Sequence, residues 1–307
     1  MIFSVLVLGS GAATPTFSRN CSSQVVTVGS KKFLIDCGEG TQNQLRQFHQ
    51  HIQSFDTIFI SHLHGDHFFG LPGLLSTMHL CGRKESVTIY APKGLKKFLD
   101  VLFDVSGTAL NYELHINEID TETPCVIHDS SWCKVTAIPL CHSVPTYGFI
   151  FEENAQLLNL RKNVRQQYNM TNKDCMDVKR GSDLILPDGS VVANKDLTLP
   201  PHKARRYAYC CDTGLFEGLT RMVEDADLLC LESTFDDSFS SLAESRQHLT
   251  AAQAAKVAAE ANVKQLMLTH FSARYRDVEP LLNEARAFFP NTIPASDGVV
   301  VEIPMRH

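Results

Sequence analysis

The chain has 307 residues, of which 44% are hydrophobic, and its formal net charge at neutral pH is −6. A chain of this length can bury a substantial core, either as one large α/β domain or as two smaller ones. No apolar run approaches the roughly 18 residues that a membrane-spanning helix needs, so we expect no membrane span.

Ten cysteines are spread along the sequence without the spacing of a zinc finger. Most lie in apolar, strand-like runs, as do Cys37 and the adjacent Cys210 and Cys211. Buried thiols of this kind are typical of a reducing compartment, so the pattern predicts free cysteines and a cytoplasmic location.

Strand-like and helical patterns alternate along the chain. The N-terminal run 2–8 is predicted as the first β-strand, because it lacks the basic start and the cleavage site of a signal peptide. Further strands are predicted at 23–28, 32–36, 56–61, 86–91, 133–139, 146–151, 206–211, 227–232, 264–269 and 298–303. Helices are predicted near 41–52, 67–80, 94–104, 250–261 and 277–288. This order predicts an α/β fold, an αββα sandwich of two mixed β-sheets with outer helices, as a single domain over 1–307.

Residues 152–206 break this pattern and are predicted to form an inserted arm that projects from the domain. Residues 155–206 hold ten Lys or Arg and five Asp, a charge of +5 that leaves −11 for the rest of the chain. A hairpin signal, Leu-Ile-Leu-Pro-Asp-Gly-Ser-Val-Val, lies at 184–192. The alternative is a solvated loop. We favour an arm that binds nucleic acid, because an otherwise negative protein needs a local basic region to hold a phosphate backbone.

The segment Ser61-His-Leu-His-Gly-Asp-His directly follows the predicted strand 56–60. His62 and His64 alternate with a leucine, so an extended backbone directs both imidazoles to one side. Gly65 permits a sharp turn into a helix, which brings Asp66 and His67 to the same corner. Imidazole and carboxylate donors without thiolate suit zinc or a neighbouring transition metal. The alternative, a histidine-rich surface loop, does not account for the apolar strand before it.

Three more candidate ligands lie at the carboxyl ends of predicted strands. These are His142, Asp212 and His270. Each alone would be weak support, because lone histidines usually satisfy local hydrogen bonds. Together with the cluster at 61–67 they form the pattern of a dispersed metal site.

The order His-x-His-x-Asp-His, then His, Asp and His, resembles that of the metallo-β-lactamase superfamily. The flanking residues narrow the resemblance to ribonuclease Z, the tRNA 3′-processing endonuclease family. It covers essentially the whole chain and includes Leu8-Gly-Ser-Gly-Ala, Ile35-Asp-Cys-Gly-Glu-Gly-Thr-Gln, Ser61-His-Leu-His-Gly-Asp-His-Phe-Phe-Gly-Leu-Pro-Gly-Leu-Leu, His142-Ser-Val-Pro-Thr-Tyr-Gly-Phe, Asp212-Thr-Gly, His248-Leu-Thr-Ala and Thr269-His-Phe-Ser-Ala-Arg-Tyr.

The resemblance implies two Zn²⁺ per subunit. One would be held by His62, His64 and His142, the second by Asp66, His67 and His270, with Asp212 as the bridge. Two such cations can activate water at neutral pH and neutralise charge on both oxygens of a phosphoryl displacement. Asp66 is placed to accept the proton of the water.

The resemblance also implies roles for residues outside the ligand set. His248 would protonate the leaving 3′ oxygen, and Glu232 is our candidate for the acid that orients it. Ser272, Arg274 and Tyr275 would hold the scissile phosphate. The structural alternatives are a surface histidine at a helix start for His248 and a plain turn for 272–275.

The implied activity is a zinc-dependent endoribonuclease that removes the 3′ trailer from precursor tRNA and leaves a 3′-hydroxyl. The family works as a homodimer in which one subunit's arm presents the substrate to the other's site. Two alternatives stay open: a dinuclear zinc hydrolase of small phosphodiesters or related esters, and an RNA-binding relative without activity. The chain departs from the family at Phe17, where a loop lysine is usual, and around 171–175, where the arm usually carries a proline- and glycine-rich turn.

Overall fold

A computed structural model describes residues 2–154 and 157–305. The chain forms two compact units, one from Met1–Glu152 with Arg206–Ile303 and the other built on Glu153–Arg205. The second unit covers nearly the same residues as the arm expected at 152–206.

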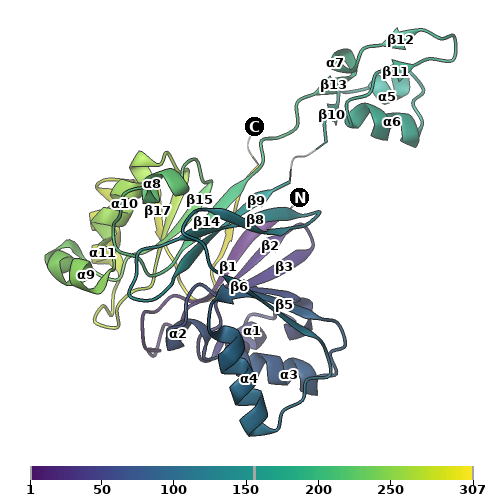
Figure 1. Ribbon diagram of the computed structural model, residues 1–307. Coiled ribbons are helices and arrows are strands. Elements are labelled where there is room, and N and C mark those ends of the chain that lie inside the picture. Colours follow the sequence, from purple (N-terminus) through teal and green to yellow (C-terminus); the bar gives the residue numbers. More distant parts are fainter. Residues whose placement is uncertain (1, 155–156, 306–307) are drawn as a thin grey trace. The chain divides into compact units, whose positions relative to one another are not determined.

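The first unit contains two seven-stranded sheets (Figure 1). The first sheet has the strand order β18-β1-β2-β3-β4-β5-β6. Its strands β1, β2 and β3 pair antiparallel, whereas β3 to β6 pair parallel. The strands are β1 (Phe3–Gly9), β2 (Ser23–Val28), β3 (Lys31–Ile35), β4 (Thr57–Phe59), β5 (Val87–Pro92), β6 (Leu114–Ile119) and β18 (Val300–Glu302).

The second sheet has the strand order β17-β16-β15-β14-β9-β8-β7. Strands β14 to β17 pair parallel, while β9 joins β14 antiparallel and β7 joins β8 antiparallel. The strands are β7 (Cys125–Asp129), β8 (Cys133–Pro139), β9 (Tyr147–Glu153), β14 (Arg206–Cys210), β15 (Leu228–Glu232), β16 (Gln265–Thr269) and β17 (Thr292–Pro294).

The two sheets pack face to face, and helices cover their outer faces (Figure 1). Between the sheets, Phe59 lies 5.3 Å from Phe149 and Phe33 lies 5.5 Å from Phe151, centroid to centroid. The helices of the first unit are α1 (Thr41–Gln47), η1 (Ile52–Ser54), α2 (Gly65–Phe68), α3 (Leu71–Leu80), α4 (Leu95–Ser106), α8 (Leu219–Met222), η2 (Asp237–Phe239), α9 (Ser240–Arg246), α10 (Ala251–Glu260) and α11 (Glu279–Arg286). The predicted αββα sandwich is therefore confirmed.

Two predicted helices are shorter than their apolar pattern. The predicted helix 67–80 is broken into α2 and α3, because the Gly70 N–H donates to Cys37 O instead of continuing α2. A Cβ on Gly70 would lie 2.1 Å from Gly38 O, so this close approach requires glycine. The predicted helix 41–52 ends as α1 at Gln47, and His49 then adopts a left-handed backbone, with φ of 55°.

The larger strands that the sequence pattern missed lie at sheet edges. β6 ends the first sheet, and β7 and β17 lie at the two edges of the second. Most residues of β6 and β7 are partly or fully exposed, so these strands lack the apolar signal of a central strand.

The second unit is small and has a core of its own. It contains β10 (Asn159–Leu160), α5 (Val164–Gln167), α6 (Asn172–Lys179), β11 (Leu184–Ile185), β12 (Val191–Val192), α7 (Asn194–Leu197) and β13 (Thr198–Leu199). Its buried apolar core consists of Val164, Met170, Val178, Leu184 and Leu197. The predicted hairpin at 184–192 forms as the antiparallel pair β11–β12. Thr171 starts α6 with a capping box to Asp174, in the region where the family's turn is absent.

The structure bears on the expected absence of membrane spans and on the state of the cysteines. No helix in the described residues is both long and apolar enough to cross a bilayer. The ten cysteines form no disulfide within the described residues, and six of them are buried, although Cys81 and Cys125 are exposed.

Candidate metal centre

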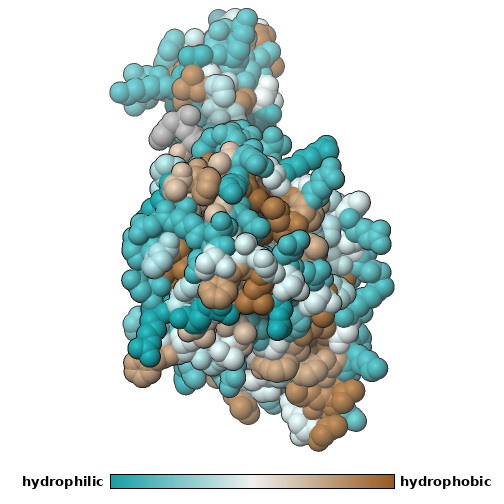
Figure 2. Space-filling model, turned by 90° about the vertical axis from the view of Figure 1, so that its left-hand side faces the viewer, coloured by the Kyte–Doolittle hydropathy of each residue, from teal (hydrophilic) through white to brown (hydrophobic). Residues whose placement is uncertain are grey.

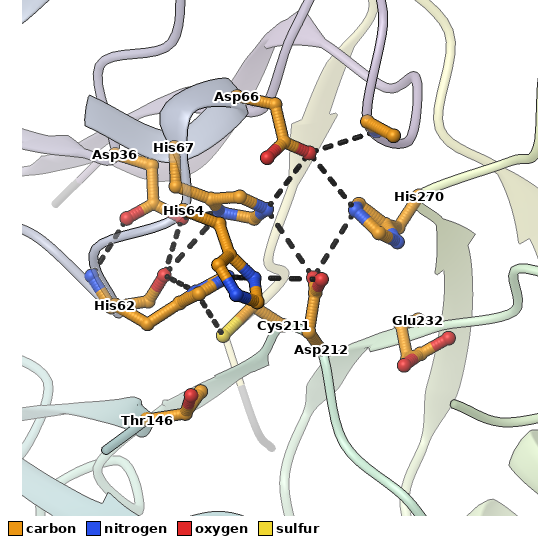
Figure 3. Close-up of polar contacts among 12 residues, drawn as sticks. Asp36, His62, His64, Asp66, His67, Thr146, Cys211, Asp212, Glu232 and His270 are labelled. Carbon is orange, nitrogen blue, oxygen red and sulfur yellow. Dashed lines mark hydrogen bonds and ion pairs between the residues drawn. The ribbon is translucent and has the colours of Figure 1, made fainter. Parts of the chain in front are cut away.

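The structure brings together all seven side chains that the sequence named as ligands, and Figure 3 labels all of them except His142. Most of them follow the carboxyl ends of strands: β4 precedes His62, β8 precedes His142, β14 precedes Asp212 and β16 precedes His270. Asp66 and His67 lie on the short helix α2 that follows His64. Their ligand atoms form two groups within which all atoms lie within 4.8 Å of one another. These groups are His62, His64, His142 and Asp212, and Asp66, His67 and His270.

The carboxylate of Asp212 faces both groups. Its Oδ2 lies 3.7 Å from His62 Nε2 and 3.8 Å from His142 Nε2. Its Oδ1 lies 3.3 Å from His67 Nε2 and 3.1 Å from His270 Nε2. One oxygen toward each group is the arrangement that a bridging carboxylate requires.

In each ligand histidine except His64, Nδ1 faces an outer partner and Nε2 faces the centre. In four of them Nδ1 points outward to an oxygen. His62 Nδ1 lies 3.1 Å from Ser61 Oγ, and His67 Nδ1 lies 2.7 Å from Asp36 Oδ2. His142 Nδ1 lies 3.2 Å from Gln247 O, and His270 Nδ1 lies 3.0 Å from Thr234 Oγ1. These partners assign the proton of each ring to Nδ1 and leave Nε2 as a lone-pair donor facing inward. His64 instead turns Nδ1 inward, 3.1 Å from His62 Nε2.

Orphaned atoms at the centre fit a cation. Within the described part of the chain, His67 Nε2, His270 Nε2 and Asp212 Oδ1 are buried and have no hydrogen-bond partner. Buried polar atoms are almost always satisfied, so three converging orphans mark a place for another group. Because they are two imidazole lone pairs and a carboxylate oxygen, a divalent metal with nitrogen and oxygen ligands fits them.

Charges at this centre shift its pKa values in opposite directions. Burial alone would lower the pKa of His67, but the carboxylates of Asp212, Asp36 and Asp66 raise it well above the usual value. Burial, helped by the charge of His67, lowers the pKa of His62. Burial opposes ionisation of Asp212, yet the surrounding histidines hold the pKa of its carboxyl well below the usual range. The carboxylates around His67 therefore favour a positive charge at this position, which a bound cation would supply.

Asp36, for which the sequence suggested no role, supports the centre from behind. It is fully buried, and its carboxylate accepts from Ser61 N at 2.7 Å, Ser61 Oγ at 2.8 Å and Tyr209 OH at 2.7 Å, besides His67. Its backbone is left-handed, with φ of 54°, a strained conformation that persists where surrounding contacts fix it. The motif Ile35-Asp-Cys-Gly contained this residue, but no local pattern indicated that Asp36 contacts His67, 31 positions away.

His248 lies next to the metal ligands and is paired with Glu232. Its Nδ1 donates to Glu232 Oε1 at 2.7 Å, and Glu232 also accepts from Thr213 N at 2.9 Å and Thr234 Oγ1 at 2.6 Å. Burial opposes the charged imidazole, but the charge and hydrogen bond of Glu232 raise the pKa of His248 to about 9. The sequence missed Thr234, which links this pair to His270.

The three residues predicted to hold phosphate are placed differently. Ser272 and Arg274 line the cavity above the metal ligands, and Arg274 Nε donates to Ser272 Oγ at 3.2 Å. The guanidinium of Arg274 lies 4.3 Å from the ring centroid of Phe239. The hydroxyl of Tyr275 accepts from Asp236 N at 2.9 Å, and Tyr275 is outside the set of residues that line this cavity.

The cavity has a volume of about 770 Å³ and opens onto His64, Asp66, Asp212, His248 and His270. One wall is the loop after β1, where Ala13 N donates to Asp66 Oδ2 at 2.8 Å. Ala13 and His270 both have left-handed backbones, with φ of 60° and 59°. Strained residues that hold or orient ligand atoms are typical of functional sites.

Comparison with known proteins finds relatives that match nearly the whole chain. A curated ribonuclease Z of Bacteroides fragilis is 42% identical over 301 residues, spanning 98% of this chain and 99% of that protein. A ribonuclease Z of Porphyromonas gingivalis is 38% identical, with the same coverage of both chains. The chain belongs to the ribonuclease Z family.

A solved structure and a family model indicate the fold of this ribonuclease Z family member. The crystal structure of the short form of human tRNase Z superposes with a TM-score of 0.71 at 29% identity, covering 98% of this chain and 99% of that one. A family model described as a beta-lactamase superfamily domain matches residues 197–271. A model described as anti-Pycsar protein Apyc1 matches residues 3–159. The protein therefore has the metallo-β-lactamase fold.

Proposed function

We propose that this protein is an endoribonuclease that acts on the 3′ ends of precursor tRNA in the cytoplasm. Membership of the ribonuclease Z family over the full chain supports this activity. The single observation that carries it is the convergence of seven nitrogen and oxygen donors with a histidine–carboxylate pair beside them. This combination suits hydrolysis of a phosphodiester.

We propose two Zn²⁺ per subunit as the cofactor. His62, His64 and His142 would hold one ion, Asp66, His67 and His270 the other, and Asp212 would bridge them. When bound, the cations supply a lowered pKa for water and neutralise charge on the phosphate. The inward lone pairs and the orphaned buried atoms described above support this assignment.

The chain's own groups account for proton transfer. Asp66 Oδ2, held by Ala13 N, is the group we assign to accept a proton from the attacking water. His248, oriented by Glu232, is the group we assign to protonate the leaving 3′ oxygen of the tRNA. Ser272 and Arg274 offer a hydroxyl and a fixed positive charge for the phosphate at the cavity wall.

We propose that the second unit, residues 153–205, is the tRNA-binding arm. Its basic side chains can grip the phosphate backbone of a folded RNA without reading its sequence. A small phosphodiester, the substrate of our alternative function, gains nothing from such a unit. The arm is therefore the region whose removal separates the two functions.

The experiment that tests the function is deletion of residues 155–203 with two substrates. The design keeps Glu153 and Arg205, whose side chains form two hydrogen bonds of 2.7 and 2.6 Å and can close the stump. We expect cleavage of precursor tRNA to collapse while hydrolysis of a small aryl phosphodiester persists. Unchanged tRNA cleavage would contradict the role of the arm, and failure of the intact protein to cut precursor tRNA would contradict the function.

We further propose a homodimer that uses the exposed face of α4. Lys97, Phe98, Val101, Leu102 and Val105 line an apolar groove of about 620 Å³. Figure 2 shows hydrophobic residues at the lower end of the molecule, which is the end where Figure 1 shows α3 and α4. A second copy antiparallel to the first would set Lys97 of each copy near Asp104 of the other, and a two-fold axis requires this kind of self-complementarity.

Light scattering of Val101→Glu tests this interface, with Val126→Glu on the edge strand β7 as control. Both valines are about half exposed, so neither substitution buries a new charge in the core. We expect the α4 variant to be monomeric and the control to be dimeric. A dimer that survives Val101→Glu would place the interface elsewhere, and a monomeric wild-type protein would exclude the homodimer.

A further inference from the structure

A phenylalanine ring is exposed inside the active-site cavity. Phe69 lines the cavity together with Gly65 and Asp66, and 59% of its surface is accessible. The preceding Phe68 is 4% exposed and packs in the core between the first sheet and its helices. Two adjacent, chemically identical residues are thus divided, with one ring in the core and the other in the cavity.

The Phe69 ring is held in place by its neighbours. It rests against Gly65, where an added Cβ would lie 2.4 Å from Phe69 Cε2. Its centroid lies 4.9 Å from that of Phe68, with the ring planes at 60°. The glycine between the metal ligands His64 and Asp66 therefore provides the space that this ring occupies.

The backbone around Phe69 is fixed as firmly as the ring. Phe69 N donates to Gly65 O at 3.0 Å, and Gly70 N donates to Cys37 O at 2.9 Å. Cys37 N in turn donates to His67 O at 2.7 Å, which joins this turn to the loop that carries Asp36. The ring is thus presented by the same rigid turn that presents Asp66 and His67.

The rest of the cavity limits what such a ring can bind. The other walls carry metal ligands, His248, Arg246 and Arg274, which are suited to a charged phosphate and not to a purely apolar ligand. A molecule that places an anionic backbone on these groups and a flat apolar surface on Phe69 is a single-stranded nucleic acid. Unpaired bases stack on exposed aromatic rings in this way.

We infer that Phe69 is a base-stacking platform for one of the nucleotides that flank the cleaved phosphodiester. The inference rests on the proposed function and adds to it a residue that positions the RNA strand. The ring lies three residues from Asp66, so a base stacked on it belongs to a nucleotide close to the cut. Stacking tolerates any base, so the platform would fix the position of the strand without reading its sequence.

The test is a double-mutant cycle between the protein and the substrate. Phe69→Ala, Phe69→Trp and wild-type protein are compared on a precursor tRNA and on versions with one abasic nucleotide on either side of the cut. We expect Phe69→Ala to lower kcat/KM roughly 5- to 100-fold, as loss of one stacked base does, and Phe69→Trp to restore it. At one position, the abasic substrate should cost the wild-type protein a similar factor and the Ala variant nothing more.

Controls separate stacking from folding. Phe288→Ala removes another partly exposed ring, which packs under Lys256 outside this cavity, and should leave cleavage unchanged. Zinc content and thermal midpoint of Phe69→Ala should match those of the wild type. The inference would be overturned if Phe69→Ala cleaved precursor tRNA as fast as the wild type. It would also be overturned if the effects of Phe69→Ala and of the abasic nucleotide on kcat/KM were independent at every position tested. A wild-type protein that leaves the unmodified precursor intact would instead overturn the proposed function.

Discussion

The metal centre and the second unit hold their candidate functional groups in opposite ways. At the centre, most ligands are buried and their outer atoms have partners, so that Asp36 alone accepts four hydrogen bonds. The second unit has five buried apolar core residues, and most of its cations, such as Lys173 and Arg180, lie at the surface. We therefore expect single changes at the centre to be severe, and single changes in the arm to be mild and additive.

Asp212→Asn removes the shared carboxylate and should be the most damaging single change. Because each oxygen of Asp212 faces a different ligand group, both groups lose a charged ligand at once. We expect zinc measured by elemental analysis to fall below two equivalents and turnover to drop by orders of magnitude. Two equivalents retained under the same conditions would contradict the bridging role.

His248→Ala should slow turnover by roughly 10²- to 10⁴-fold, which is the usual contribution of a general acid. Zinc content should stay at the wild-type value, because all seven ligands remain. His115→Ala is a matched control, since that histidine is exposed on β6. Normal turnover of the His248 variant would assign the proton to another group.

Asp36→Asn should reduce metal affinity or activity by roughly 10- to 100-fold, as loss of a carboxylate behind a ligating histidine does. The amide keeps the shape of the side chain but no longer stabilises the ring proton of His67. Zinc titration against a chromogenic chelator measures the change. Asp56→Asn changes a partly exposed aspartate paired with Lys31 and should have no such effect. Equal zinc affinities for the two variants would contradict the role of Asp36 in supporting the metal centre.

Glu232→Gln should move the alkaline limit of activity to lower pH. The carboxylate raises the pKa of His248 to about 9 in the protein without metal, so the acid form is lost as pH rises through the pKa. Bound cations lower that pKa, and the neutral amide lowers it further. The pH profile of kcat for tRNA cleavage measures the shift, and an alkaline limb identical to the wild type would exclude this pair as the acid.

The smallest effect is expected in the arm. Lys173→Ala should weaken tRNA binding slightly and reduce the slope of log K against log salt concentration by roughly 1 or less, with kcat unchanged. Lys84→Ala, an exposed lysine of the first unit, is the control. If Lys173→Ala weakened tRNA binding as much as deletion of the arm does, the arm would bind tRNA through this one residue and not through its overall charge.

The sequence alone determined the central strands, the αββα order and the types of ligand at the centre. These are local signals: a strand has a period of two residues, and the run 61–67 needs only one turn to converge. The edge strands β6 and β7 escaped prediction because they are short and mostly partly or fully exposed, and so lack the continuous apolar run of a central strand.

The residues that support the ligands became apparent from the packing of the two sheets. Asp36 meets Tyr209 across 173 positions of sequence, and Arg19 donates to Ser272 O across 253. The structure also places the adjacent residues Arg274 and Tyr275 differently. Arg274 lines the cavity, whereas the hydroxyl of Tyr275 accepts a hydrogen bond from Asp236 N. The physical reason is that a buried polar group must find its partner wherever the packed sheets bring one, and no local pattern encodes that distance along the chain.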